Sequence, residues 1–421
     1  MDKPRLFLNY REFLFVVGVL LVVATMRLYL LHIEYMEFVE KPFYYTKAKV
    51  LLQYTKNGNN RPYEVLKLEC EDGKLLYTTA HLRSSIVGKI VRVKLLPDKS
   101  ISFYDYLGTY YVKSRLKVVG DVPPTTKSRL LDAISAQHKE HNATLLYQAI
   151  FLATPIPSNL REKISALGVS HLVALSGFHL TILWGIIYGL LAILYKPLQQ
   201  RWFPYRMMLL DMGLLTLVIL GYYLWLVDMP PSLVRSYAMA VVVWLALLVG
   251  IEIISFQLLG FVVALLLALS PTLIVSMGFY FSIAGVFYIY LVLHWGRESS
   301  KWLVTILYIP IGIFILMLPV VHTLFGMISP WQILSPLLSL SFVLFYPLSI
   351  VLHIVGAGSL FDGGLLYLFD LTSPPYREHI LPIWYLAIYL TLSFFAIFSR
   401  LFFVATVVSA ISYGIYLVSL F

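Results

Sequence analysis

The 421-residue sequence has little charge and almost no cysteine. Only 13% of its residues are charged, whereas 59% are hydrophobic, and the mean hydropathy is +0.80. A soluble globular protein has about 25% charged residues, so this chain cannot cover a water-facing surface. The scarcity of charge excludes an ordinary cytoplasmic enzyme, a disordered protein and a secreted disulfide scaffold, and it leaves an integral membrane protein.

The only cysteine, Cys70, excludes an internal disulfide and a multi-cysteine zinc site. We expect its thiol to pack as a small hydrophobe, the alternative being a reactive thiol. The sequence also has no phosphate-binding loop, so no ATP-driven motor is visible in it. HExxH and HxHxDH motifs are absent, and we expect His138 and His141 on an exposed helix face. The sequence therefore predicts no enzymatic activity, no catalytic residue, no metal site and no cofactor.

The excess of positive charge is concentrated in one segment. The chain has 32 Lys and Arg against 22 Asp and Glu, and residues 41–117 hold 15 of the former but only 6 of the latter. This segment alternates apolar and polar residues with period two, as in 90–95, and turn signals such as Asp72-Gly73 divide it. The pattern predicts a small β-domain of five or six strands over residues 41–118, with an OB-like barrel as the leading candidate. Either a solvated surface or a polyanion-binding surface accounts for the charge.

The remaining segments predict a polytopic α-helical membrane protein. Residues 1–11 are basic and are expected in the cytoplasm. Residues 12–33 are an apolar run that is long enough to span a bilayer, and no Ala-x-Ala-like cleavage site follows it, so we interpret it as an uncleaved anchor. Residues 121–170 predict a linker and amphipathic helices, one of them over 130–152, which lie in the membrane interface or pack on the β-domain.

Residues 171–421 predict nine further spans, which makes about ten, some of them broken or re-entrant. Basic loops at 196–206 and 297–301 fall on the cytoplasmic side if the N-terminus is cytoplasmic. The β-domain then lies outside the membrane.

Two polar segments interrupt the apolar region. The first runs from His171 to His179 and contains Ser176-Gly177, which permits a kink or a close helix crossing. It predicts either a polar stripe along a pore or satisfied packing at a helix crossing. The second runs from Asp228 to Arg235 and contains Ser232 as a candidate helix cap. Arg235 falls in the first turns of a span, where the helix dipole disfavours a cation, so it needs Asp228, a lipid phosphate or a nucleic-acid phosphate as partner.

These segments resemble the ComEC family of competence proteins. His171-Leu-Val-Ala-Leu-Ser-Gly-Phe-His179 is close to the family's His-Leu-Leu-Ala-Ile-Ser-Gly-Leu-His run, and Pro231-Ser232-Leu-Val-Arg235 matches its Pro-Ser-x-x-Arg element. Stretches from Ser270-Pro271 and from Ser329-Pro330 are also similar, so the likeness covers about 145–420. The resemblance implies an inner-membrane DNA channel of bacterial natural transformation with an OB-like domain outside the membrane. Many members add a C-terminal metallo-β-lactamase-like nuclease domain, which we expect to be absent because the sequence ends at Phe421 directly after a span.

The function predicted from the residues and the resemblance is translocation of single-stranded DNA across the inner membrane. The expected partners are single-stranded DNA, membrane lipid and a separate DNA receptor, nuclease and cytoplasmic motor. The candidate pore residues are His171, Ser176, Gly177, His179, Ser232 and Arg235. The candidate DNA-binding residues are Arg83, Lys89, Arg92, Lys94 and Lys99.

Aromatic side chains of the β-domain would stack on bases unless strand alternation places them in its core. The candidates are Tyr77, Phe103, Tyr104, Tyr106, Tyr110 and Tyr111. Two other functions fit the sequence: a transporter of a smaller anionic solute, and a membrane scaffold that binds anionic lipid.

Overall fold

The computed structural model describes residues 6–7, 9–57, 62–82, 84–121, 125–252, 254–372 and 376–421. The chain folds into two compact units. We call Asn9–Thr125 together with Val263–Met277 the β unit, and the unit built mainly from Thr126–Val262 and Gly278–Phe421 the helical unit. The helical unit carries most of the apolar helices.

The β unit contains a six-stranded sheet in the order β5-β3-β2-β1-β4-β6. The strands are β1 (Tyr44–Asn57), β2 (Pro62–Cys70), β3 (Leu75–Ala80), β4 (Lys89–Leu96), β5 (Thr109–Tyr111) and β6 (Lys113–Asp121). Strands β5 and β6 lie at opposite ends of this order, yet only Val112 separates them in the chain. The two edges therefore meet and the sheet closes on itself. The pair β3–β5 is parallel and the other neighbouring pairs are antiparallel.

The period-two pattern of the sequence builds the core of this sheet. Strand β4 buries Val91, Val93 and Leu95, while Arg92 between them is exposed. Successive side chains of a strand point to opposite faces, so one face is apolar and the other is charged. Cys70 lies in the same core with 6% of its surface exposed, and burial raises the pKa of its thiol to about 12. The expectation that Cys70 packs as a small hydrophobe agrees with this position.

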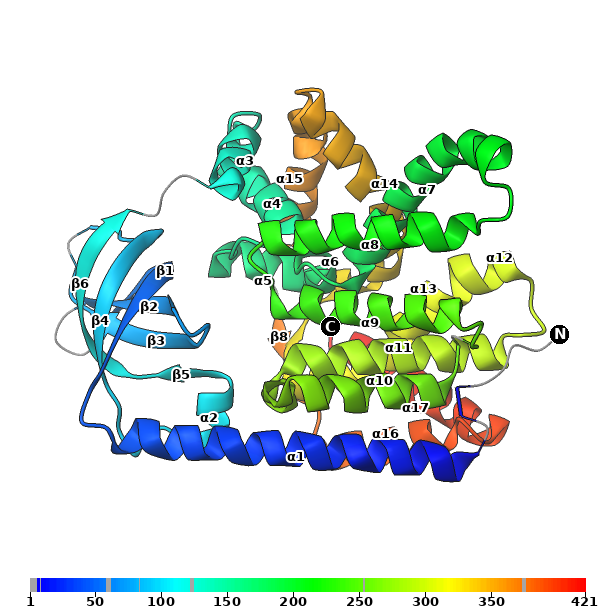
Figure 1. Ribbon diagram of the computed structural model, residues 1–421, viewed down its shortest axis with the longest axis horizontal. Coiled ribbons are helices and arrows are strands. Elements are labelled where there is room, and N and C mark those ends of the chain that lie inside the picture. Colours follow the sequence, from blue (N-terminus) through cyan, green and yellow to red (C-terminus); the bar gives the residue numbers. More distant parts are fainter. Residues whose placement is uncertain are drawn as a thin grey trace. The chain divides into compact units, whose positions relative to one another are not determined.

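Helix α1 (Tyr10–Glu40), which belongs to the β unit, is one continuous helix and extends past the apolar run to the six-stranded sheet (Figure 1). The Tyr35 hydroxyl donates to the carbonyl of Ile101 at 2.7 Å, and Tyr35 packs against the barrel core. Arg27, a cation within an otherwise apolar run, donates to the carbonyls of Ala268 (3.0 Å) and Leu269 at the end of α10 (Phe256–Leu269). A cation is stabilised at a helix C-terminus, which accounts for Arg27 at this position.

The helical unit is built from helices of very different lengths. The shorter ones are α3 (Thr126–Ser135), α4 (His141–Leu152), α5 (Ser158–Ala166), α6 (Ser170–Val173), α15 (Asp362–Leu371) and α16 (Ile383–Phe395). The longer ones are α7 (Gly177–Trp202), α8 (Met208–Leu226), α9 (Pro231–Leu248), α11 (Met277–Trp295), α13 (Ile309–Leu324), α14 (Ser335–Ile354) and α17 (Arg400–Ser419). Helix α13 continues from α12 (Lys301–Leu303) through a π-helical stretch, Val304–Tyr308. Over the residues that the structure describes, eight helices are long and apolar enough to cross a membrane, and α10 and α16 are shorter apolar helices. The predicted polytopic helical membrane protein with a small β-sheet region is confirmed.

The prediction of one helix over 130–152 is wrong. The structure has α3 and α4 there, because the chain leaves helical geometry from Ala136 to Glu140. Buried tyrosines join the short α16 to the longer α13 and α11: the Tyr389 hydroxyl donates to the Leu316 carbonyl at 2.8 Å, and Tyr288 shares a hydrogen bond with Ser393 at 3.1 Å. These tyrosine hydroxyls thus find hydrogen-bond partners inside the apolar interior, as buried polar groups usually do.

Candidate functional site

The first functional feature is the meeting of the starts of α7 and α9. The Ser232 hydroxyl donates to the carbonyl of Leu175, just before α7, at 2.6 Å. A Cβ atom added to Gly177 would lie 2.8 Å from Oγ of Ser236, so the glycine allows the two helices to approach closely. The expectation that Ser232 caps its own helix is wrong, because α9 begins one residue earlier at Pro231 and the Ser232 side chain bonds to the neighbouring segment.

Ser176 and His179 form the cap of α7. Oγ of Ser176 accepts from the N–H of Phe178, and Nδ1 of His179 accepts from the N–H of Ser176 at 3.3 Å. In a neutral ring the proton then sits on Nε2. The His179 side chain is fully buried, with its ring edge-on to Phe342 (5.1 Å between centroids) and Tyr346 (5.0 Å) of α14. His179 therefore holds the start of α7 in place from the interior of the helical unit.

Arg235 lies one turn into α9 with 5% of its surface exposed. A Cβ added to Gly278, at the start of α11, would lie 3.0 Å from Nη2 of Arg235, so this glycine makes room for the guanidinium. Asp228, expected as one partner of Arg235, forms an ion pair with Lys127 at 2.9 Å. The starts of α7 and α11 thus each contact the first turns of α9, α7 at Ser232 and Ser236 and α11 at the buried Arg235.

We call this group the helix-start cluster; its residues are Ser176, Gly177, His179, Ser232, Arg235, Ser236 and Gly278. Each helix N-terminus carries about half a positive charge, and the N–H groups of the first turn have no intrahelical partner. The starts of α7, α9 and α11 and the Arg235 guanidinium together create a positive potential within an apolar unit. The cluster is therefore suited to an anion and disfavours a cation.

The second functional feature is a cationic face on the sheet of the β unit. Register pairing places Arg92 directly between Lys47 and Lys117, and places Lys94 directly between Tyr45 and Arg115. Residues directly opposite in neighbouring strands lie on the same face of a sheet. The cationic face is therefore formed by Lys47, Arg92, Lys94, Arg115 and Lys117.

The cationic face has little internal compensation. Lys47 pairs with Glu71 at 3.8 Å, whereas the other four cations have no carboxylate within 4.0 Å in the part of the chain that the structure describes. Aromatic rings lie among them: Nζ of Lys94 is 4.2 Å from the ring centroid of Phe43, and the Arg92 guanidinium is 5.5 Å from that of Tyr45. Both rings are about half exposed. This combination of cations and exposed rings suits a polyanion with planar bases.

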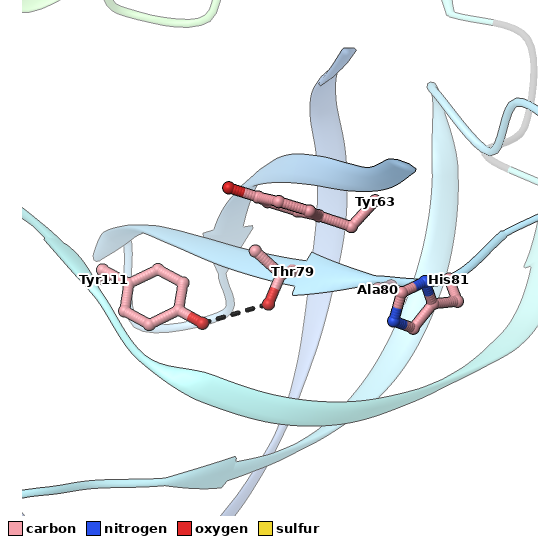
Figure 2. Close-up of a pocket in the computed structure, with 5 residues that line it drawn as sticks. All are labelled: Tyr63, Thr79, Ala80, His81 and Tyr111. Carbon is pink, nitrogen blue, oxygen red and sulfur yellow. Dashed lines mark hydrogen bonds between the residues drawn. The ribbon is translucent and has the colours of Figure 1, made fainter. Parts of the chain in front are cut away.

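A hollow of about 400 Å³ lies on β2, β3 and β5, at the other end of the strand order from β4 and β6 (Figure 2). Figure 2 shows the rings of Tyr63, Tyr111 and His81 around it, with the Tyr111 hydroxyl hydrogen-bonded to Oγ1 of Thr79 at 3.0 Å. The hollow is open, and flat rings form part of its lining. It is large enough to admit a planar ring system rather than a whole folded partner.

A sequence model of the competence protein family matches residues 153–421, which is more than half of the chain. The chain belongs to the ComEC-type competence protein family. No match is found among curated proteins or among solved structures. The matched region of this competence protein contains the whole helix-start cluster, and the cationic face precedes it in the sequence.

The structure brings five of the six candidate pore residues of this competence protein into the helix-start cluster. The sixth, His171, lies on α6, where its Nε2 is 3.1 Å from Oγ of Ser339 on α14. Ser236 and Gly278 of this cluster were not predicted from the sequence. The signal for Ser236 is its spacing of one helical turn from Ser232, and Gly278 lies within a stretch that resembles the family.

Two of the five candidate DNA-binding residues, Arg92 and Lys94, lie on the cationic face. Lys89 begins β4, Lys99 is exposed in the turn after β4, and Arg83 lies outside the described residues. Lys47, Arg115 and Lys117 were not predicted from the sequence, although the alternation of Arg115 and Lys117 in one strand was a signal.

Burial divides the aromatic residues of the β unit into two groups. Tyr106 and Tyr110 belong to the core, whereas Tyr104 and Tyr111 are exposed. Strand alternation in β5 buries Tyr110 and exposes Tyr111, whereas Tyr104 and Tyr106 lie on different faces of the short helix α2 (Phe103–Leu107). Among the described residues, no group of three or more His, Cys, Asp or Glu side chains could hold a metal ion.

Proposed function

We propose that this competence protein conducts single-stranded DNA across the bacterial inner membrane during natural transformation. The observation that carries the proposal is the helix-start cluster, where the starts of α7 and α11 contact the first turns of α9, which carry Arg235, inside the family-matched region. A strand of DNA carries one negative charge per nucleotide, and a low-dielectric interior makes a fixed positive potential strong. The cluster supplies that potential to passing phosphates without reading their sequence.

The cationic face supports a capturing role for the β unit. Like charges directly opposite one another destabilise a sheet, so the row of Lys47, Arg92 and Lys117 is unfavourable until an anion neutralises it. Phosphates would meet that demand, and Phe43 and Tyr45 stand beside the row to stack bases. The closed sheet with a parallel β3–β5 pair supports an OB-like barrel, whose strands 2 and 3 typically face nucleic acid. The hollow lined by Tyr63 and Tyr111 lies on that side.

In the orientation that we propose, the N-terminus and the basic loops near Arg201 and Arg297 are cytoplasmic, α1 spans the membrane, and the six-stranded sheet of the β unit is periplasmic. The sequence has no phosphate-binding loop, so we assign the pulling step to a separate cytoplasmic motor. DNA capture at the cell surface and removal of the second strand are assigned to a separate receptor and nuclease.

Single cysteines test the orientation in a Cys70→Ala background. We expect a membrane-impermeant maleimide to label Lys99→Cys in intact spheroplasts and to label Arg201→Cys only after the membrane is opened. The opposite pattern would reverse the proposed topology.

The test of function is natural transformation in a strain that lacks this chain, with fluorescent DNA followed across both membranes. The proposal expects DNA to accumulate outside the inner membrane and expects no transformants, with recovery by the intact gene. Normal entry of DNA into the cytoplasm would contradict the channel assignment and would favour transport of a smaller anion.

A binding test separates DNA capture from attachment to lipid. The full chain is placed in nanodiscs of zwitterionic lipid, and binding of fluorescent single-stranded DNA of mixed sequence is measured at several salt concentrations. We expect sequence-independent binding that weakens steeply with salt. Absence of DNA binding, together with salt-sensitive binding of the chain to anionic vesicles, would favour the scaffold function instead.

A further inference from the structure

Three titratable side chains from distant parts of the sequence meet inside the helical unit. His138 lies between α3 and α4, His353 near the end of α14, and Asp362 at the start of α15 (Figure 1). Nδ1 of His138 is 2.9 Å from Oδ2 and 3.0 Å from Oδ1 of Asp362, and its Nε2 is 2.9 Å from Nε2 of His353. Nδ1 of His353 is in turn 2.7 Å from the carbonyl oxygen of Ser349. These contacts form one continuous chain of hydrogen bonds.

The number of protons in this chain follows from its geometry. The Ser349 carbonyl can only accept, so Nδ1 of His353 carries a hydrogen. The two Nε2 atoms need one hydrogen between them, because two facing lone pairs repel. The contact between His138 and Asp362 needs another. The complete chain of three hydrogen bonds therefore holds three protons, whereas two neutral imidazoles beside a carboxylate supply only two.

The side chains around His138, His353 and Asp362 neither supply nor take up the third proton. The Tyr147 ring of α4 stacks on His138 with 4.6 Å between centroids and an interplanar angle of 11°. Burial and the Asp362 carboxylate raise the pKa of Tyr147, so its phenol stays neutral. Phe151 packs edge-on to His353 at 5.0 Å. The charged and titratable residues that follow His138 in the loop are exposed: Lys139, Glu140 and His141.

Burial makes the third proton structurally important. The His138 side chain is fully buried and lies outside a helix, so the expectation of an exposed helix face is wrong for His138; the Asp362 side chain is 13% exposed. A buried polar group that loses its hydrogen bond destabilises the fold far more than an exposed one. The same region is joined by Gln137, whose Oε1 accepts from the N–H of Gly358 at 2.9 Å and whose Nε2 donates to the carbonyl of His353 at 3.0 Å. The side chains of the α3–α4 loop therefore bridge to both α14 and the start of α15.

We propose that His138, His353 and Asp362 form a binding site for one proton, and that this proton fastens the α3–α4 loop to α14 and α15. With the proton bound, all three hydrogen bonds form and the group carries no net charge. Loss of the proton leaves one contact without a hydrogen. The fastening is therefore lost as the pH rises and this proton dissociates.

The variant Asp362→Asn tests the proton count directly. The asparagine amide can donate to Nδ1 of His138, His138 then donates from Nε2 to His353, and all three hydrogen bonds form with two neutral rings. We expect the melting temperature of the wild-type full chain in nanodiscs to fall on the alkaline side, by about 2–4 °C more than that of the variant. Equal alkaline slopes of the two proteins, or a wild-type melting temperature that does not change with pH, would overturn the proposal.

Two further variants separate the proton site from general loss of stability. Asp370→Asn removes an exposed carboxylate of the same helix, which pairs with Lys163 at 3.8 Å, and it should keep the wild-type pH profile. In Gly358→Ala the new Cβ would lie 2.7 Å from Oε1 of Gln137 and 2.8 Å from Nε2 of His353. This variant should lower the melting temperature and remove the alkaline fall. An unchanged pH profile in Gly358→Ala would argue against the site even if Asp362→Asn failed to fold.

Discussion

In the β unit cations face one another across neighbouring strands, whereas in the helical unit several charged side chains are held against the chain itself. Arg92 stands between Lys47 and Lys117 with little acidic compensation. In the helical unit, by contrast, Asp228 pairs with Lys127 at 2.9 Å and Asp362 lies 2.9 Å from His138. Solvent screens the first arrangement and tolerates it, but an apolar surrounding would not.

This difference shows that the β unit presents its cations to the solvent, whereas the helical unit pairs several of its charges internally. An exposed row of like charges is a surface that an external anion can neutralise. A buried charge has to be satisfied close by, so its position is determined by packing. Arg235 resembles both kinds of charge. It is nearly buried, as a charge fixed by packing is, yet it lies near helix starts, where the potential is already positive and favours an anion. The predictions below test this contrast in order of decreasing effect.

Arg235→Ala should have the largest effect. It removes the cation of the helix-start cluster, and we expect transformation to fall to the level of the deletion strain while the protein level stays normal. Arg235→Lys should be intermediate, because lysine keeps the charge but lacks the planar fork of donors. His179→Ala should also abolish transformation, because the cap of α7 is lost. The measurement is transformant frequency beside an immunoblot, and full transformation in both alanine variants would refute a role of the cluster in passage.

Charge removal on the cationic face should weaken DNA binding without unfolding the protein. We expect Arg92→Gln with Lys94→Gln to lower affinity for single-stranded DNA and to reduce the salt slope by about 0.7 for each lost phosphate contact. Lys56→Gln with Lys139→Gln removes the same charge from exposed positions outside this face. Equal loss of affinity in the two double variants would show that net charge, and not the face, binds DNA.

A smaller effect is expected where helices touch. Gly177→Ala should destabilise the helical unit by about 1–3 kcal/mol, because the new methyl group meets Ser236. Gly185→Ala and Gly189→Ala, in the same helix, have nothing within 4 Å of the added Cβ and should be neutral or slightly stabilising. Thermal unfolding in one detergent compares the three, and a similar loss in all would place the defect in α7 itself and not in the α7–α9 contact.

The smallest effect is expected at Cys70. Because burial raises the pKa of its thiol to about 12, only about 10⁻⁴ of it is thiolate at pH 8. Maleimide should therefore leave the native chain unlabelled and react fully after denaturation, as mass spectrometry would show. Rapid labelling of the native protein would mean that the core around Cys70 opens. Cys70→Ala should retain DNA binding and transformation.

Local patterns were sufficient for the class of protein and for most of its elements. Long apolar runs predicted the spans because a helix must satisfy its backbone hydrogen bonds inside a bilayer whatever its neighbours are. Period-two alternation predicted the β-sheet and the outward direction of Arg92 and Lys94. The run from His171 to His179 indicated the family, which the match over residues 153–421 established. The break between α3 and α4 was missed because the apolar positions on both sides continue one helical pattern.

Only the tertiary structure decided which side chains meet. Register placed Lys47 and Lys117 on either side of Arg92, and no local pattern determines register between separate strands. His138 and His353 are 215 residues apart, and each is unremarkable in its own segment. Composition and periodicity depend on near neighbours in the chain, so they determine elements and their buried faces. Sites such as the helix-start cluster arise from packing between distant elements, where a missing Cβ or one hydrogen bond determines the geometry.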